Sequence, residues 1–592
     1  MGFPEHGTAI SAVKRVRIWY ALLVFVIGIF GVRLFYIQII RYDHYKQAAL
    51  ADQLKQEQIP ATRGIIEAHE GDSVVPVVLN QRLYTVFADP VDIKTYKTDP
   101  SKVAAAAAQV LGGSASDYEK DLKLAGTRYS VLAKKVSQQQ RDTLMGYRFA
   151  GLYSEEQDYR TYPQSALASQ LLGFVNDDGV GEYGVEQDLD TQLKGTPGEL
   201  KAITDLNGVP LAASKNNIQK APIAGNNLVL TLDLGMQQQL ETMLAQGTKD
   251  DKAESASALI MDPNTGAIKA MANYPTYDPS QYQNVSDPSV FENAAVSSPI
   301  EVGSIMKTLT TSAALDQGVI TPSTTFYDPA HWLVDGFNIT DIEEDGGPGT
   351  QSIASLLNLS LNTGATWELM QMGGGQLNAK GRGIWNDYMV NHFQLGKQTG
   401  IEQGYEATGY VPSPRDNGAG IDLTYANTAF GQAMTATPLQ MGAALSSVLN
   451  GGTYYQPYLV DQTISADGKT TDTKPKVVES HTVAPKVGQE MIPLMQYVVD
   501  HHNIIPAFDQ SKYIVGGKTG TAQIAKPGGG YYDDEFNGTY VGFVGGSKVQ
   551  YVIVVFVIKP HVAGYAGAGA AQPIFANLAH MLINNSYVTP KP

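Results

Sequence analysis

A serine and a lysine three residues apart, Ser304 and Lys307, stand at the start of a helix-like run over Thr308–Leu315. Residues at this spacing share one face of a helix, so their side chains would lie together. A serine hydroxyl becomes a strong nucleophile when a neighbouring base takes its proton. A lysine whose pKa is lowered by burial or by a nearby cation can be that base. Because Ser-x-x-Lys arises by chance in long chains, an isolated copy would indicate only a surface helix.

Two further motifs follow in the order expected for one acyl-transfer site. They are the triplet Ser360-Leu361-Asn362 and the segment Lys518-Thr519-Gly520-Thr521. With Ser-x-x-Lys they make up the set of motifs found in enzymes that act through an acyl-serine. Alone, Ser360 and Asn362 would more often cap a helix, and the second segment would be a strand end and a turn. The three motifs in order favour catalysis.

The residue types assign a role to each polar side chain. Ser304 is the predicted nucleophile and Lys307 its base. Ser360 would relay a proton to the leaving amine, and Asn362 would hold the peptide backbone of the substrate. Lys518 would supply a positive charge that keeps Lys307 neutral and attracts a carboxylate.

The strand that follows Lys518 is predicted to bind the substrate. Thr519 and Thr521, two apart on a strand, would point the same way and hydrogen-bond the substrate carboxylate. Gly520 would remove a side chain where the substrate backbone comes close. The backbone N–H groups of Ser304 and Thr521 would form an oxyanion hole, in which one donor is typically worth about 10²–10³ in rate.

The composition of the 592-residue chain is that of a globular protein with more than one domain. Hydrophobic residues make up 43%, and the net charge of −16 argues against nucleic-acid binding. The absence of cysteine excludes disulfides and thiol chemistry. The ten histidines show no ligand-like spacing, so we expect neither a metal nor a cofactor.

Residues 18–40 predict a membrane anchor. Ile18–Ile40 is apolar apart from Arg33 and one glutamine, and about 20 such residues span a bilayer as a helix. The run is too long for a signal peptide, and no small-x-small cleavage site follows it. Three basic residues precede the run: Lys14, Arg15 and Arg17. They predict a cytoplasmic tail over residues 1–17, with the rest of this single-pass protein of the cell membrane outside the cytoplasm.

Residues 41–222 predict a mixed α/β pedestal module. We expect a polar helix over Tyr45–Gln58, a strand at Leu83–Ala88 and helical structure over Asp99–Gln140. Glycines and prolines between Tyr159 and Gly198 mark tight turns. The module contains no catalytic constellation, which favours a spacer or an interaction surface.

Residues 223–592 predict the catalytic domain. We expect a helix at Met236–Gly247, a hairpin turn at Asp262–Gly266, and helices from Ser304 to about Asn450. Late strands and a final helix follow at Val515–Ile524, Thr539–Val544, Val549–Ile558 and Pro573–Asn584. The predicted α+β fold is one antiparallel five-stranded sheet flanked by helices, with an all-helical subdomain. The strand with Lys518 would then lie beside the helix with Ser304.

With these motifs, the chain resembles the class B penicillin-binding proteins, the membrane-anchored D,D-transpeptidases that cross-link peptidoglycan. The resemblance runs from the anchor to the last helix, and Lys518–Gln523 is a particularly full match. Further segments that carry it are Arg63-Gly64, Gly173-Phe174, Gly184-Val185-Glu186, Asp262-Pro263 with Thr265-Gly266, Gly396 with Thr399-Gly400, Gly431-Gln432 and Thr437-Pro438-Leu439-Gln440. It implies a dimerisation-like pedestal followed by a penicillin-binding, β-lactamase-like transpeptidase domain.

The resemblance also implies a substrate and partners. Ser304 would attack a stem peptide ending in D-Ala-D-Ala, release D-alanine and pass the acyl group to the amine of a neighbouring stem. β-Lactams imitate that dipeptide and would acylate the same serine. A glycosyltransferase of the SEDS type would be a partner, contacted through the anchor and pedestal within a division or elongation complex. The short link from Gly173 through Gly181 to Glu186 resembles division-type enzymes more than elongation-type ones.

The chain departs from the family pattern at two places. Val302 stands where many relatives have proline, which puts in question how rigidly the start of the nucleophile's helix is held. The usual Asp-Arg-Asn-Gly after Arg-Gly-x-Ile is replaced around Glu67–Gly71, which leaves the pedestal subtype open.

Two alternatives remain open. The first is a β-lactamase or D,D-carboxypeptidase that passes the acyl group to water, although a secreted β-lactamase would need neither an uncleaved anchor nor a pedestal. The second is a non-catalytic cell-wall scaffold or β-lactam sensor. The intact catalytic motifs argue against lost chemistry, and only a short cytoplasmic segment is available for signalling.

Overall fold

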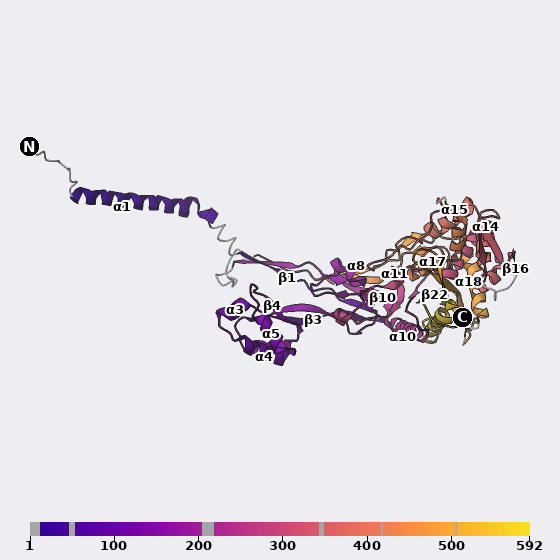
Figure 1. The fold of residues 1–592 in the computed structure, drawn as a ribbon, viewed down its shortest axis with the longest axis horizontal. Coiled ribbons are helices and arrows are strands. Elements are labelled where there is room, and N and C mark those ends of the chain that lie inside the picture. Colours follow the sequence, from indigo (N-terminus) through magenta and orange to yellow (C-terminus); the bar gives the residue numbers. More distant parts are fainter. Residues whose placement is uncertain are drawn as a thin grey trace, which may run out of the picture. The chain divides into compact units, whose positions relative to one another are not determined.

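The computed structural model describes residues 12–45, 54–203, 218–341, 348–415, 418, 420–502, 504 and 506–592 (Figure 1). The chain divides into two compact units. One contains residues 1–62 and 195–224, and the other contains residues 63–194 and 225–592.

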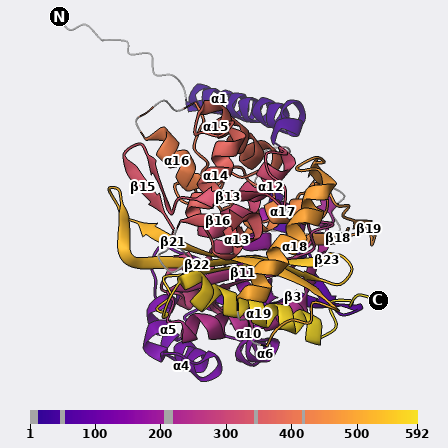
Figure 2. The ribbon, with the colours of Figure 1, turned by 90° about the vertical axis from the view of Figure 1, so that its right-hand side faces the viewer.

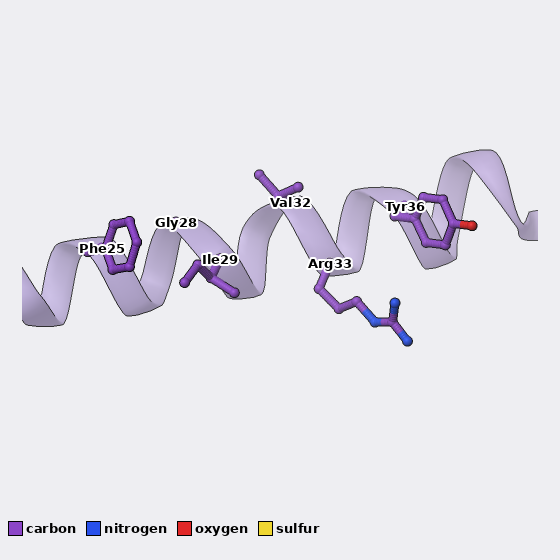
Figure 3. Close-up of a pocket in the computed structure, with 6 residues that line it drawn as sticks. All are labelled: Phe25, Gly28, Ile29, Val32, Arg33 and Tyr36. Atoms are coloured by element: carbon purple, nitrogen blue, oxygen red, sulfur yellow. The ribbon is translucent and has the colours of Figure 1, made fainter.

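The first unit begins with a long apolar helix. α1 (Ala12–Phe35) continues into a π-helical turn, η1 (Tyr36–Ile40). Residues Lys14–Ile40 make a 27-residue run that is long and apolar enough to cross a membrane, since about 20 residues suffice. The predicted span Ile18–Ile40 is helical throughout. Figure 3 shows the Arg33 side chain projecting from this helix one turn before Tyr36, and the guanidinium carbon lies 5.8 Å from the centroid of the Tyr36 ring.

A three-stranded antiparallel sheet is the other part of this unit. It consists of β1 (Leu54–Ile59), β8 (Gly198–Ile203) and β9 (Ile218–Lys220) in the order β1-β8-β9. The predicted helix over Tyr45–Gln58 is therefore wrong for residues 54–58, and residues 46–53 lie outside the described residues. Leu54 pairs with Ile203, far along the chain, and such a partner leaves no trace in local periodicity.

The second unit contains a seven-stranded mixed sheet of order β19-β18-β10-β2-β3-β4, with β5 also paired to β3. Its strands are β2 (Ile66–Glu70), β3 (Ser73–Ala88), β4 (Ser130–Val136), β5 (Leu152–Thr161), β10 (Asn227–Asp233), β18 (Val460–Ile464) and β19 (Thr470–Asp472). The helices in this part of the chain are α3 (Pro90–Thr95), α4 (Pro100–Leu111), α5 (Ala115–Leu122) and α6 (Gln138–Gly146). The helical prediction for Asp99–Gln140 is correct for α4 and α5 but misses β4, which is a strand because it pairs with β3.

A buried network of ion pairs joins three segments of this unit, which carry Arg63, Arg160 and Glu186. The Glu186 side chain is fully buried, and its two oxygens lie 2.5 Å from Arg63 Nη2 and 2.8 Å from Arg160 Nη2. Arg63 Nη1 also lies 2.6 Å from Asp190 Oδ1. Short elements surround the network: α7 (Ser169–Leu172), β6 (Phe174–Val175), β7 (Gly181–Glu182), α8 (Gly184–Asp188) and α9 (Asp190–Leu193).

Replacing Glu186 by glutamine is expected to destabilise the fold strongly. The change leaves Arg63 and Arg160 buried without their shared counter-ion, and breaking a buried pair typically costs about 3–5 kcal/mol. We expect a lower thermal unfolding midpoint for the full-length protein in detergent. Glu156→Gln is the control, because Glu156 pairs with Arg82 at side-chain exposures of 50% and 66%. Exposed pairs are worth about 0–1 kcal/mol. Equal midpoints for the two variants would contradict the prediction.

The catalytic part of the second unit is built on an antiparallel five-stranded sheet of order β12-β11-β23-β22-β21. Its strands are β11 (Ser255–Met261), β12 (Ile268–Tyr274), β21 (Ile514–Ala525), β22 (Tyr531–Gly545) and β23 (Val549–Ile558). The predicted turn at Asp262–Gly266 joins β11 to β12, and the three predicted late strands fall within β21, β22 and β23. Figure 2 shows α10 (Leu234–Asp250) and α19 (Gln572–Asn584) on one face of this sheet and α17 (Pro438–Leu449) and α18 (Pro485–His501) on the other.

The central strand shows why both faces must be covered. In β23 the side chains of Val552, Val554 and Phe556 enter one hydrophobic cluster. The alternating Ile553, Val555 and Val557 enter a second cluster, with α10 and α19. A strand that is apolar at every position is buried on both faces.

The segment between the early and late strands is mostly helical. Its longer helices are α12 (Lys307–Asp316), α13 (Ile353–Asn358), α14 (Asn362–Met372), α15 (Ala379–Asp387) and α16 (Ile421–Thr428). Its shorter turns are η2 (Pro279–Asn284), η3 (Pro288–Phe291), α11 (Ala294–Ser297), η4 (Gly303–Met306) and η6 (Tyr388–His392), and η7 (Gly567–Ala571) precedes α19.

The prediction that this subdomain is all-helical is wrong, because it also contains short strands. β13 (Thr325–Asp328) pairs with β16 (Gly349–Ser352), and β14 (His331–Val334) pairs with β15 (Phe337–Thr340). A further two-stranded ladder joins β17 (Tyr454–Tyr455) to β20 (Val477–Glu479). The β13–β16 and β14–β15 ladders are too short to give a strong alternating pattern, and the second of them reaches the candidate site.

Candidate active site

The nucleophile candidate is held on a short turn that is bonded to two other segments. Ser304 lies in η4, and Lys307 is the first residue of α12. The Gly303 N–H donates to the carbonyl of Gly431 at 2.9 Å. The carbonyl of Val302, which stands at the family's proline position, accepts from Thr539 Oγ1 at 2.7 Å. The peptide between Val302 and Gly303, at the start of the turn, is thus bonded at both its N–H and its carbonyl.

The amine of Lys307 faces the other predicted polar groups. Its Nζ lies 2.9 Å from Ser304 Oγ, 2.9 Å from Asn362 Oδ1 and 3.2 Å from Ser360 Oγ, and it also donates to the Ser360 carbonyl. A neutral amine has two N–H donors and one lone pair. If the donors serve Asn362 Oδ1 and the Ser360 carbonyl, the lone pair remains for the Ser304 hydroxyl proton. The geometry therefore suits general-base activation of Ser304.

Ser360 lies between the two lysines. Its hydroxyl oxygen is 3.0 Å from Lys518 Nζ and 3.2 Å from Lys307 Nζ, and both lysine side chains are fully buried. The backbone of Ser360 is left-handed, with φ of 60°, a conformation that a non-glycine residue holds only when its surroundings impose it. A hydroxyl that contacts two amines in this way can pass a proton between them and a leaving group.

The Lys518 strand lies directly beside the nucleophile's turn. A Cβ on Gly520 would lie 2.2 Å from Thr539 Oγ1, 2.8 Å from the Val302 carbonyl and 3.1 Å from the Ile305 nitrogen. This packing is a reason for glycine that the sequence did not reveal, and the expected approach of the substrate backbone to Gly520 stays a prediction. The space that its missing side chain leaves is used by the protein itself, so that β21 can contact η4.

Thr519 and Thr521 lie on the less buried side of β21, whereas Lys518 and Gly520 are buried. This alternation agrees with the prediction that the two threonines point the same way. Thr521 Oγ1 accepts a hydrogen bond of 3.0 Å from the Gly567 N–H, so its own proton is oriented away from that donor. Sequence reasoning missed Gly567, and the only signal was a short glycine- and alanine-rich run before the last helix.

Asn362 is held from two sides. Its Oδ1 faces Lys307 Nζ, and its Nδ2 donates to the carbonyl of Thr340 at 3.1 Å. Thr340 ends the β14–β15 hairpin, which sequence reasoning did not predict. Among the described residues, no group of three or more histidine, aspartate and glutamate side chains is placed to hold a metal ion.

A buried carboxyl lies behind the catalytic lysine. Glu368, on α14, is fully buried, and its Oε2 accepts from Thr311 Oγ1 at 3.0 Å. Burial raises the pKa of Glu368 to about 8, against the opposing effects of the Thr311 hydrogen bond and the positive charge of Lys307. At neutral pH the group is therefore mostly protonated, so it adds little negative charge that would favour the charged form of Lys307.

The Glu368 carboxyl is expected to make stability depend on pH. An unfolded glutamate loses its proton near pH ~4.3, whereas the folded one keeps it to about pH 8. The stabilising contribution is thus complete below the unfolded pKa and is lost as the pH rises through the folded pKa. Glu368→Gln stays neutral and should lose less thermal stability than the wild type between pH 5 and pH 8. Parallel pH profiles would contradict this, and Glu254→Gln, at an exposed side chain, is the control.

Two family models match the chain. The penicillin binding protein transpeptidase domain matches residues 256–580, more than half of the chain, and the penicillin-binding protein dimerisation domain matches residues 58–230. Stage V sporulation protein D of Bacillus subtilis (strain 168) is 30% identical over 586 residues, which cover 98% of this chain and 87% of that protein. The peptidoglycan D,D-transpeptidase FtsI of Escherichia coli (strain K12) is 24% identical over 583 residues, 96% of this chain and 90% of the relative.

Solved structures share the fold. Penicillin-binding protein 2X from Streptococcus thermophilus matches with a TM-score of 0.70 and 22% identity, over 90% of this chain and 80% of that one. Penicillin-binding protein 3 from Mycobacterium tuberculosis, complexed with aztreonam, matches with a TM-score of 0.67 and 24% identity, over 90% and 98%. With a dimerisation domain before a transpeptidase domain, and an apolar helix before both, the chain belongs to the class B penicillin-binding proteins.

Proposed function

We propose that this protein is a membrane-anchored serine D,D-transpeptidase that cross-links peptidoglycan stem peptides through an acyl-enzyme on Ser304. The observation that carries the proposal is the distance of 2.9 Å between Lys307 Nζ and Ser304 Oγ. Asn362 Oδ1 and the Ser360 carbonyl occupy other directions around the same amine. Family membership supports the reaction class, since the similar Escherichia coli protein is named a peptidoglycan D,D-transpeptidase.

Acylation follows from this geometry. Lys307 takes the Ser304 proton as Oγ attacks the carbonyl carbon of the penultimate D-alanine of the donor stem. The oxyanion would be stabilised by the backbone N–H groups of Ser304 and Thr521. The C–N bond then breaks, and Ser360 passes a proton to the leaving D-alanine amine. Lys518 and the hydroxyls of Thr519 and Thr521 would hold the terminal carboxylate of the donor.

Transfer of the acyl group reverses these steps. An amine of a neighbouring stem peptide attacks the ester carbon, gives its proton to the site, and restores the Ser304 hydroxyl. A β-lactam would acylate Ser304 in the same way by opening its ring amide. Because the leaving nitrogen stays tethered to the acyl group, the β-lactam adduct blocks the site where the acceptor amine would enter.

The location and partners belong to the same proposal. Residues 1–17 would be the cytoplasmic tail, 18–40 the anchor, 41–222 the pedestal and 223–592 the extracytoplasmic catalytic domain. A SEDS-type glycosyltransferase would contact the anchor and pedestal, and similarity to FtsI favours a division complex. Protease added outside spheroplasts should degrade residues 223–592 and spare an epitope placed before residue 12.

The molecule that accepts the acyl group, an amine or water, distinguishes a transpeptidase from a hydrolase. We would incubate the full-length protein in detergent with fluorescent penicillin, and separately with a thioester donor and a labelled D-amino acid. A label that lasts for hours, together with transfer to the D-amino acid, is the expected result. A label that disappears within minutes, with hydrolysis as the only product, would favour a β-lactamase or carboxypeptidase. No label on a folded sample would favour a scaffold or sensor.

A further inference from the structure

The end of the β14–β15 hairpin holds the start of α14 at three points. The carbonyl of Thr340 accepts from Asn362 Nδ2 at 3.1 Å. Asp341 Oδ1 accepts from the Thr363 N–H at 3.0 Å. Trp332 Nε1 donates to the Thr363 carbonyl at 3.1 Å. The consecutive residues Thr340 and Asp341 thus accept hydrogen bonds from the candidate catalytic Asn362 and from its neighbour Thr363.

The Thr363 hydroxyl stands between two carboxyl groups. Its Oγ1 lies 2.8 Å from Asp328 Oδ1 and 2.5 Å from Asp341 Oδ2, and Thr363 and Asp328 are buried at 0% and 1% exposure. A hydroxyl has one hydrogen and cannot donate to both carboxylates. If both acids were ionised, one oxygen would face the Thr363 oxygen with no proton between them. One of the two carboxyl groups must therefore supply a second proton.

Asp341 is the better carrier of that proton. Each carboxyl group accepts one backbone N–H, Asp328 from Ala330 at 2.9 Å and Asp341 from Thr363 at 3.0 Å, so these bonds do not distinguish them. Burial raises the pKa of Asp341, and the charge of Asp328 acts in the same direction. The hydrogen bonds from Thr363 and the positive charge of Lys307 oppose the rise.

We propose that Asp341 is a positioning residue for acylation, which holds Asn362 against Lys307 through a chain of two shared protons. Asp341 Oδ2–H donates to Thr363 Oγ1, and the Thr363 hydroxyl donates to Asp328. The inference rests on the proposed acyl transfer at Ser304. The printed bonds of Asp341 go to Thr363, one residue away from Asn362, so its loss should slow acylation without removing it.

Two substitutions at Asp341 test whether the acylation rate depends on the shared proton or only on the packing of the side chain. In Asp341→Asn the amide can donate to Thr363 Oγ1 and accept from the Thr363 N–H, as the protonated acid does. We expect its second-order rate constant for acylation by fluorescent penicillin to stay within about threefold of the wild type at pH 7. Asp341→Ala lacks both bonds and should be slower by about 10–100-fold, since small misplacements at a site can cost that much. At completion, both variants should carry one penicillin label per protein chain.

The experiment uses the full-length protein in detergent, with Asn338→Ala, at an exposed position of β15, as the control. As the pH rises through the raised pKa of Asp341, the wild type should lose the shared proton and slow, whereas Asp341→Asn should keep its rate. Equal slowing of the asparagine and alanine variants, or coinciding pH profiles for wild type and Asp341→Asn, would overturn the proposal. If the alanine variant does not fold, the comparison of wild type with Asp341→Asn still decides. Absence of labelling in the wild type would refute the proposed function instead.

Discussion

Ser304→Ala is expected to abolish covalent labelling by a penicillin while the protein stays folded. The substitution removes the oxygen that forms the ester, and Lys307 Nζ then has no hydroxyl proton at that position to accept. The turn that carries residue 304 should persist, because the Gly303 N–H donates to the Gly431 carbonyl and the Thr539 hydroxyl donates to the Val302 carbonyl. Intact-protein mass spectrometry after incubation measures the added mass directly, and the thermal unfolding midpoint reports the fold.

The control for this variant is Ser360→Ala. Ser360 carries the other hydroxyl close to Lys307, at 3.2 Å, so it is the alternative nucleophile that the geometry offers. We expect this variant to label more slowly but to carry the adduct on Ser304, as peptide mapping would show. An adduct that persists in Ser304→Ala, on Ser360 or elsewhere, would refute the assignment of the nucleophile.

Lys307→Ala is expected to lower the acylation rate constant by about 10²–10⁴, the usual contribution of general acid–base catalysis. Its amine is the group within hydrogen-bonding distance of Ser304 Oγ, at 2.9 Å. The measurement is the time course of labelling by fluorescent penicillin over a range of concentrations, with the unfolding midpoint as a check on the fold.

Lys307→Arg separates the two ways in which the lysine can act. A guanidinium keeps the positive charge but is not deprotonated in proteins. If Lys307 is the base, the arginine variant should lose about as much rate as the alanine variant. An arginine variant close to the wild-type rate would show that the site needs a cation there, and another group would then have to take the Ser304 proton.

Local sequence patterns were enough to predict the elements whose partners are near in the chain. The apolar run of α1, the turn between β11 and β12 and the continuous apolar strand β23 all have strong local signals. The three motifs predicted which residues meet, because Lys307, Ser360 and Lys518 belong to segments whose order and chemistry match one known kind of site. In the structure their side chains lie within hydrogen-bonding distance of one another through Ser360.

The remaining elements depend on pairing and packing partners that lie far away in the chain. Leu54–Ile59 is a strand because it pairs with Gly198–Ile203, and β4 is a strand because β3 lies beside it. Gly520 is needed by the nucleophile's turn, which only the packing of β21 against η4 reveals.

The sequence by itself thus predicted the apolar helix, the principal sheet and the class of reaction. Only the tertiary structure revealed what holds Asn362. Asp341 and Thr363 are separated by 22 residues, and a short hairpin with weak local preference lies just before Asp341. The contact between them depends on how that hairpin packs against α14. Local propensity and motif spacing report the chemistry of a residue and its nearest neighbours, whereas the positions of the supporting groups follow from burial and pairing across the whole domain.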